Sequence, residues 1–261
     1  MSGKASISYN LITFVITLCL LSACANSTTD VSKPNLPPVS PETLAEADKL
    51  FTERKDLAKL REAITLLTRA RRESAKNYDV EWRLARYNYY LGRHSETEEE
   101  REKAFENGKD AAKTAIRLDS NRPDGHFWFG ANLGELANQN PLTTGLKSVD
   151  EIRAAMNKVI ELQPSYELAS AYDVLGQLEL GTRMMGGSTE RAVEYLEKGV
   201  ALEKNNGELR VRLAEAYLAT DKDAEAKKQL DYLLQMRPNP QYLPEYEQQV
   251  AKARKLLETK F

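Results

Sequence analysis

The sequence predicts an all-α protein, an α-solenoid of about five helical hairpins followed by a helix that covers the last one. Three observations support this fold. Paired segments with apolar residues at helical spacing recur through most of the chain after residue 40. Small residues such as Ala214 and Ala226 fall where two helices of one pair would approach closely. The final segment, "QYLPEYEQQVAKARKLLETKF", has the helical pattern expected of a terminal cap.

The first 23 residues are predicted to be a secretory signal. Lys4 precedes an apolar run from Leu11 to Leu21, and small residues follow it. This run is too short to cross a bilayer as a helix, which needs about 20 residues. A permanent transmembrane anchor is therefore not expected.

The end of this segment, Leu21-Ser22-Ala23-Cys24, resembles the bacterial lipobox. The resemblance implies cleavage before Cys24 and lipid attachment to that cysteine, with several acyl chains anchoring the protein. The alternative is an ordinary secreted protein cut near Ala23 or Ala25. In the lipoprotein family an acidic residue after the cysteine often retains the protein at the inner membrane. Because Ala25 stands there, we expect the outer membrane, with the protein facing the periplasm.

Residues 24–40 are predicted to be a flexible tether, and residues 41–261 the helical repeat domain. The tether is rich in Ser, Thr, Asn and Pro and has too few large apolar residues to fold. Both cysteines, Cys19 and Cys24, lie before the repeat domain, so its stability depends on packing and not on disulfides. The formal net charge is only −2, which gives no indication of nucleic-acid binding.

The clearest repeat is "ELRVRLAEAYLATDKDAEAKKQLDYLLQMRPNP", which resembles the tetratricopeptide (TPR) pattern of about 34 residues. Leu213-Ala214 and Tyr217 mark its first helix, Ala226 and Leu230 its second. In the same frame, earlier hairpins begin at residue 41 and with the segments "EWRLARYNYYLG", "HFWFGANLGELA" and "SAYDVLGQLEL".

Two insertions depart from this pattern, "ANQNPLTTGLKSVD" and "GTRMMGGST". Loops of this length are either functional or tolerated insertions. For the second loop both readings stay open, because Met184 and Met185 should bury against a partner or a neighbouring hairpin. We expect these methionines at the rim of a binding surface.

A narrower resemblance covers about residues 123–202. The segments "HFWFGANLGELA", "MNKVIELQPSY" and "MMGGSTERAVEYLEKGVAL" resemble the TPR component (T component) of bacterial TRAP-type transporters, and more distantly the microtubule-dynamics regulators of eukaryotes. The T-component resemblance implies an accessory protein that binds a solute-binding protein or a hydrophobic ligand.

The inventory of reactive groups predicts no catalysis, no metal site and no cofactor. Only two histidines occur: His94 is expected in a solvated turn and His126 in a structural role. The segment Gly186–Thr189 lacks the lysine and preceding strand of a nucleotide-binding loop, so Ser188 or Thr189 is expected to cap a helix.

The TPR resemblance implies that the first helices of the hairpins line a concave surface. It places six residues on this groove: Arg83, Tyr87, Phe127, Ala131, Asp173 and Gln177. The alternative for each is a packing or ordinary surface position. The sequence thus predicts a membrane-tethered periplasmic scaffold that binds another envelope protein. Alternatives are the transporter accessory, a scaffold for envelope assembly and, least favoured, an enzyme.

Overall fold

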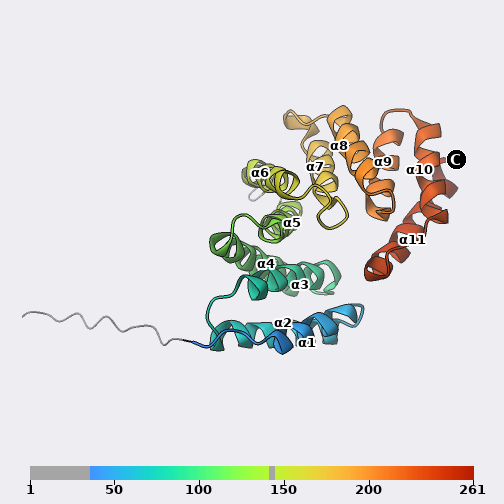
Figure 1. Cartoon of the computed structure of the whole chain (residues 1–261). Coiled ribbons are helices and arrows are strands. Elements are labelled where there is room, and N and C mark those ends of the chain that lie inside the picture. Colours follow the sequence, from blue (N-terminus) through green and yellow to red (C-terminus); the bar gives the residue numbers. More distant parts are fainter. Residues whose placement is uncertain (1–35, 141–144) are drawn as a thin grey trace, which may run out of the picture. The chain divides into compact units, whose positions relative to one another are not determined.

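The structure is a computed structural model that describes residues 36–140 and 145–261. Within these residues every regular element is helical (Figure 1), which confirms the all-α class. The predicted signal and residues 24–35 of the tether lie outside the described residues. The α-helices are α1 (Pro41–Thr52), α2 (Leu57–Glu73), α3 (Tyr78–His94), α4 (Glu98–Leu118), α5 (Pro123–Gln139), α6 (Leu146–Leu162), α7 (Ser170–Gly181), α8 (Thr189–Leu202), α9 (Gly207–Leu218), α10 (Asp223–Gln235) and α11 (Leu243–Lys260), and the short 3-10 helices are η2 (Arg183–Met185) and η3 (Pro240–Tyr242).

Helices α1 to α10 form five consecutive hairpins, as the repeat pattern predicts. Each first helix packs on its own second helix, and each second helix packs on the first helix of the next hairpin. Helix α11 packs against α9 and α10, where it covers the last hairpin. The predicted solenoid of five TPR-like hairpins with a terminal helix is therefore confirmed.

Small residues allow close contact between the paired helices. Ala214 of α9 and Ala226 of α10 are both fully buried. A Cβ atom on Gly176 of α7 would lie 2.8 Å from Leu196 of α8, closer than real side chains approach. Large apolar side chains such as Leu196 thus fill the space that a missing Cβ leaves, giving the density of a protein interior.

The "GTRMMGGST" insertion is anchored to the fold by the buried carboxylate of Glu179. Glu179 pairs with Arg153 at 2.5 Å and with Arg191 at 2.7 Å, and it accepts a hydrogen bond from the backbone N–H of Ser188. The hydroxyl of Ser188 accepts from the N–H of Arg191, so Ser188 caps α8 as expected. The cap explains the Gly-Gly-Ser-Thr pattern without a phosphate ligand.

Among the described residues, no helix combines the length and apolar character needed to cross a bilayer.

Candidate functional site

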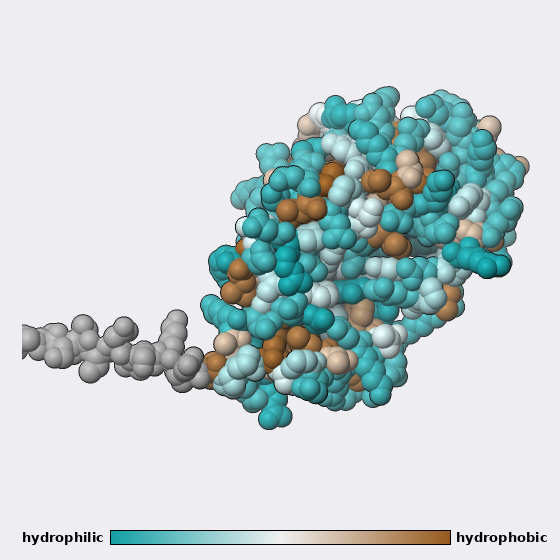
Figure 2. Space-filling model, in the orientation of Figure 1, coloured by the Kyte–Doolittle hydropathy of each residue, from teal (hydrophilic) through white to brown (hydrophobic). Residues whose placement is uncertain are grey.

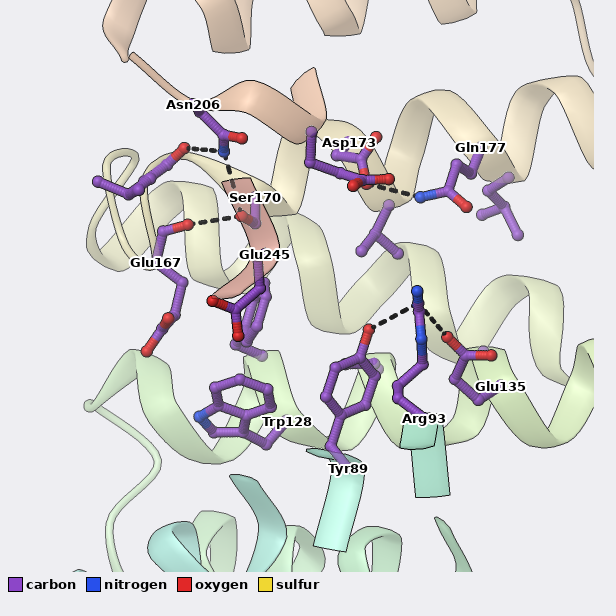
Figure 3. Close-up of a pocket in the computed structure, with 18 of the residues that line it drawn as sticks. Tyr89, Arg93, Trp128, Glu135, Glu167, Ser170, Asp173, Gln177, Asn206 and Glu245 are labelled. Atoms are coloured by element: carbon purple, nitrogen blue, oxygen red, sulfur yellow. Dashed lines mark hydrogen bonds and ion pairs between the residues drawn. The ribbon is translucent and has the colours of Figure 1, made fainter. Parts of the chain in front are cut away.

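The layer of first helices opens between α5 and α7, and a cavity of about 550 Å³ lies there. Close contacts join α1 to α3, α3 to α5 and α7 to α9, whereas α5 and α7 have almost none among the described residues. Side chains from α3, α5, α7, the start of α9 and α11 surround the cavity (Figure 3).

A left-handed turn between α6 and α7 shapes one end of this cavity. Glu167, Leu168 and Ala169 have φ angles of 46°, 57° and 60°, which are rare for residues with a Cβ atom. Asn206 holds the turn by donating to the carbonyl of Leu168 at 2.7 Å. The Glu167 carboxylate lines the cavity and accepts a hydrogen bond from the Tyr242 hydroxyl at 2.6 Å. Backbone strain of this kind is typical of binding and switch regions.

Aromatic side chains of α3 and α5 form one wall. The rings of Tyr89 and Trp128 lie 5.4 Å apart, those of Phe127 and Trp128 4.8 Å apart in an edge-to-face arrangement. Tyr90 contacts the same tryptophan at 6.2 Å. This wall offers both apolar contact and ring faces that attract cations.

Polar side chains face one another across the cavity. Arg93 of α3 donates to Glu135 of α5 at 2.8 Å and to the Tyr89 hydroxyl at 3.3 Å. On the opposite side, Gln177 donates to Asp173 at 2.6 Å, both from α7 (Figure 3).

Asp173 is the most perturbed carboxyl group of the site. It is 6% exposed, and its Oδ1 atom has no hydrogen-bond partner among the described residues. Nε of Arg212 lies 3.8 Å from that oxygen and likewise has no hydrogen-bond partner among the described residues, while Nη2 of the same side chain pairs with Glu208 at 3.0 Å. Burial, and then the nearby charge of Glu208, raise the pKa of Asp173 to about 7.

The C-terminal segment closes the cavity by reaching the first hairpin. Arg54, which follows α1 and is buried, bonds both carboxylate oxygens of Glu245, at 3.0 and 2.8 Å. It also donates to the Gln241 carbonyl at 2.6 Å. The exposed residues Lys55 and Glu247 form a second pair at 2.5 Å beside it. Helix α11 therefore does more than cover the last hairpin, because it also encloses the concave side.

The cavity brings together four of the six predicted groove residues, namely Phe127, Ala131, Asp173 and Gln177, and one predicted rim residue, Met185. Met184 is not among the lining residues and is 97% exposed. Arg83 and Tyr87 also lie elsewhere, because Asp48 of α1 engages both, Arg83 at 2.9 Å and Tyr87 at 2.5 Å. Tyr87 is fully buried against Phe51, so no partner reaches it in this structure.

The two histidines lie in different parts of the fold, and only His94 lines the cavity. His94 lies at the end of α3 and lines the cavity, where its ring contacts the Tyr90 carbonyl and Gln248 of α11. His126 contacts the Ser120 carbonyl at 3.0 Å at the start of α5, a structural role as expected. In the described part of the chain, no cluster of three His, Cys, Asp or Glu residues has metal-binding geometry.

We predict that Glu245→Gln loosens α11. The neutral amide leaves the buried Arg54 charge unpaired, which destabilises this contact by about 1–3 kcal/mol. Hydrogen exchange measured by mass spectrometry should become faster in residues 243–260. The matched variant Glu247→Gln removes an exposed pair and should change exchange little, because such pairs contribute about 0–1 kcal/mol. Equal effects of the two variants would contradict this role of Arg54.

We predict a pH-dependent gain in stability for Asp173→Asn. The folded-state pKa of about 7 lies above the ordinary aspartate value of 3.8, so the unfolded chain loses this proton first as pH rises. The free energy of unfolding of the parent therefore falls between about pH 4 and pH 7, by about 1.4 kcal/mol per unit of pKa difference. The asparagine side chain does not titrate, so this fall in the free energy of unfolding should be absent in the variant.

The measurement is the melting temperature of parent and Asp173→Asn from pH 4 to pH 8. The difference, variant minus parent, should increase through this range and level off above pH 7. A variant that becomes relatively less stable as pH rises would show that Asp173 is stabilised as an anion.

The sequence is similar to one protein family over most of its length. The model of the family "Regulator of microtubule dynamics protein 1-3" matches residues 43–259. Regulator of microtubule dynamics protein 3 from Rattus norvegicus is 28% identical over 103 residues, which are 40% of this chain and 22% of the relative. The Mus musculus protein is 28% identical over 121 residues, which are 46% of this chain and 25% of the relative. The chain thus spans about a quarter of the length of these relatives.

Solved structures confirm the repeat fold. A thermophilic TPR protein from Thermus thermophilus superimposes with a TM-score of 0.60 at 20% identity, covering 83% of this chain and 98% of that one. Pseudomonas aeruginosa PilF gives 0.52 at 16% identity, with 84% and 92% covered. At these identities the likeness concerns the fold alone. The family match covers most of the chain, and the chain therefore belongs to the family of the regulator of microtubule dynamics proteins 1-3.

Proposed function

We propose that this TPR-type protein is a scaffold that binds another protein at its concave side, with part of the partner entering the cavity between α5, α7 and α11. The observation that carries this proposal is the partly open 550 Å³ cavity, which combines an aromatic wall with a carboxylate oxygen of Asp173 that accepts no hydrogen bond from the described residues. Concave, mostly apolar sites with a few convergent polar groups are the usual form of ligand sites.

The surface elsewhere gives less support for binding. The face shown in Figure 2 is mainly hydrophilic, and its hydrophobic residues form separate small patches. Large contiguous apolar patches are what mark flat interaction surfaces. The cavity is therefore a better candidate than this face, and Met185, which lines the cavity, is the part of the "GTRMMGGST" loop that a bound partner would meet.

The family membership supports a helical-repeat binding domain rather than a specific target. The matched part is about a quarter of the rat and mouse relatives, whose names concern regulation of microtubule dynamics. From these relatives we infer only that the chain contains the same type of helical-repeat domain. The proposal of a non-enzymatic role rests on the TPR-like fold.

A second candidate is the accessory component of a TRAP-type transporter. The resemblance of residues 123–202 to the T component supports it, and the apolar part of the cavity suits a hydrophobic ligand. In that case the partner is an extracytoplasmic solute-binding protein. Binding of this chain to the solute-binding protein of a neighbouring transporter gene cluster distinguishes the two candidates.

We predict that Ala131→Phe blocks partner binding. Ala131 lines the cavity from α5, and the added ring occupies space that the partner needs. The matched variant Ala224→Phe adds the same ring at an exposed position of α10. Affinity capture from envelope extracts, with quantitative mass spectrometry, should show proteins that Ala224→Phe retains and Ala131→Phe loses by about tenfold. Equal recovery by both variants, at unchanged helicity, would place binding outside the cavity.

We also propose that the chain is tethered to the bacterial outer membrane, facing the periplasm, through a lipid on Cys24. The support is the apolar run followed by Leu21-Ser22-Ala23-Cys24 in the sequence, which lies outside the described residues.

Cys24→Ser should release the protein from membranes, because the acyl chains supply the hydrophobic anchor. Membrane fractionation and labelling with a fatty-acid analogue check this expectation. Cys19→Ser is the control, since the same reading removes Cys19 with the signal. Unchanged membrane association of Cys24→Ser would exclude the lipid anchor.

A further inference from the structure

The charges around the cavity do not balance. Three of its carboxylates have an arginine each, while two share one. The pairs are Glu135 with Arg93, Glu167 with Arg86, and Glu245 with Arg54, and the shared cation is Arg212, between Asp173 and Glu208. Arg212 also approaches Glu215, but Glu215 has a partner of its own in Lys252 at 2.9 Å. The α7–α9 side of the cavity therefore holds one carboxylate more than it holds cations.

The carboxylate in excess of the cations is that of Asp173. Glu208 uses both of its oxygens, accepting from Arg212 and from Gln249 of α11. Among the described residues, Asp173 accepts a hydrogen bond only at Oδ2, from Gln177, while the cation nearest to Oδ1 is Nε of Arg212 at 3.8 Å, and the residue is only 6% exposed. A buried carboxylate with no hydrogen bond at one oxygen and its nearest cation at 3.8 Å is unfavourable as an anion, which favours the protonated form of this group.

The aromatic wall lies across the cavity from this carboxylate. Figure 3 shows Asp173 and Gln177 descending from α7 toward Tyr89 and Arg93, which rise from α3, with Trp128 beside them. Arg93 is already neutralised by Glu135. A molecule between the two sides thus meets a carboxylate at one end and, at the other, the half-buried ring of Tyr89, behind which Trp128 is almost fully buried. Ammonium and guanidinium groups on an apolar body are the ligands that such a combination attracts.

Resting on the proposed function, we propose that the cavity binds an organic cation, with its ammonium or guanidinium group at Asp173 and Glu208 and its apolar body against Tyr89, whose ring lies 5.4 Å from that of Trp128. The cation supplies the positive charge that the site lacks. The same chemistry is offered by a lysine or arginine side chain of a partner protein and by a free amine.

The charged groups that face Asp173 predict how binding depends on pH. Glu208 raises its pKa, while Arg212 and Arg93 lower it, and His94 lies at the cavity edge. A cation that binds at pH 6 displaces the proton of Asp173, so binding should release about one proton and tighten toward pH 8.

The first experiment uses three probes of similar shape: phenethylamine as the cation, phenethyl alcohol as the neutral form and 3-phenylpropionate as the anion. Binding to the full chain is measured by calorimetry in buffers of different ionisation enthalpy. Fluorescence of Trp128 gives a second readout in a Trp82→Phe background, since the chain has two tryptophans. Phenethylamine should bind at least about tenfold more tightly than either other probe.

The second experiment removes the carboxylates one at a time. Asp173→Asn should weaken phenethylamine about tenfold or more and abolish proton release, while leaving phenethyl alcohol unchanged. Glu208→Gln should act in the same direction and serves if the first variant does not fold. Glu247→Gln, which changes an exposed carboxylate outside the cavity, is the control and should leave all three probes unaffected.

The source of the cation is tested with the peptides Gly-Gly-Lys-Gly-Gly and Gly-Gly-norleucine-Gly-Gly. Binding of the lysine peptide alone assigns the cation to a protein side chain, and binding of phenethylamine without the peptide assigns it to a free amine. Preference for 3-phenylpropionate, or equal binding of all three probes, overturns the proposal. Because the Ala131→Phe capture experiment does not depend on charge, it can still succeed in that case, and the two proposals fail separately.

Discussion

The cavity depends on the contact between Arg54 and the segment that begins α11. A TPR-like solenoid presents the concave side of its first helices as an open surface, and here one buried guanidinium ties the two ends of the repeat array together. Its charge is compensated by both oxygens of Glu245, and the rings of Phe51 and Tyr90 lie 4.9 and 5.1 Å from it. A bidentate, desolvated pair of this kind is specific in geometry because either partner alone is costly to bury.

The position of α11 accounts for both the cavity and the burial of Asp173. The left-handed turn at residues 167–169 lies between α6 and α7 at one end of the cavity, and residues of the C-terminal segment line the side of the cavity opposite α5 and α7. Water is thereby largely excluded from Asp173, which raises its pKa and leaves one oxygen without a donor. The burial of Asp173 is also the basis of the proposed selectivity, since a group that hydrogen-bonds this carboxylate gains more from entering the cavity than one that does not.

Much of the fold could be predicted from the sequence, because each hairpin repeats local spacings of small and large residues. Ala214 and Ala226 lie at a helix contact, and Ser188 caps α8, as the pattern indicates. Of the predicted groove residues, those of the third and fourth hairpins, Phe127, Ala131, Asp173 and Gln177, line the cavity. Those of the second hairpin, Arg83 and Tyr87, are engaged by Asp48 of α1 instead. The contact spans 35 and 39 residues, about one repeat, but the repeat pattern specifies small and large apolar positions and not the polar pairs between neighbouring first helices.

The sequence pattern also did not indicate the cavity, because the contacts that form it are not part of the repeat pattern. No sequence motif marks Trp128, Arg93 or Glu208. They line one cavity only in the folded chain, where α11 contacts the first hairpin. The direct test is proximity across this closure in the full chain with Cys19 and Cys24 replaced by serine. Lys55→Cys with Glu247→Cys should be joined efficiently by a short bismaleimide, whereas Lys55→Cys with Lys260→Cys, at the far end of α11, should not. Equal or absent cross-linking of the first pair would show that α11 does not close the concave side.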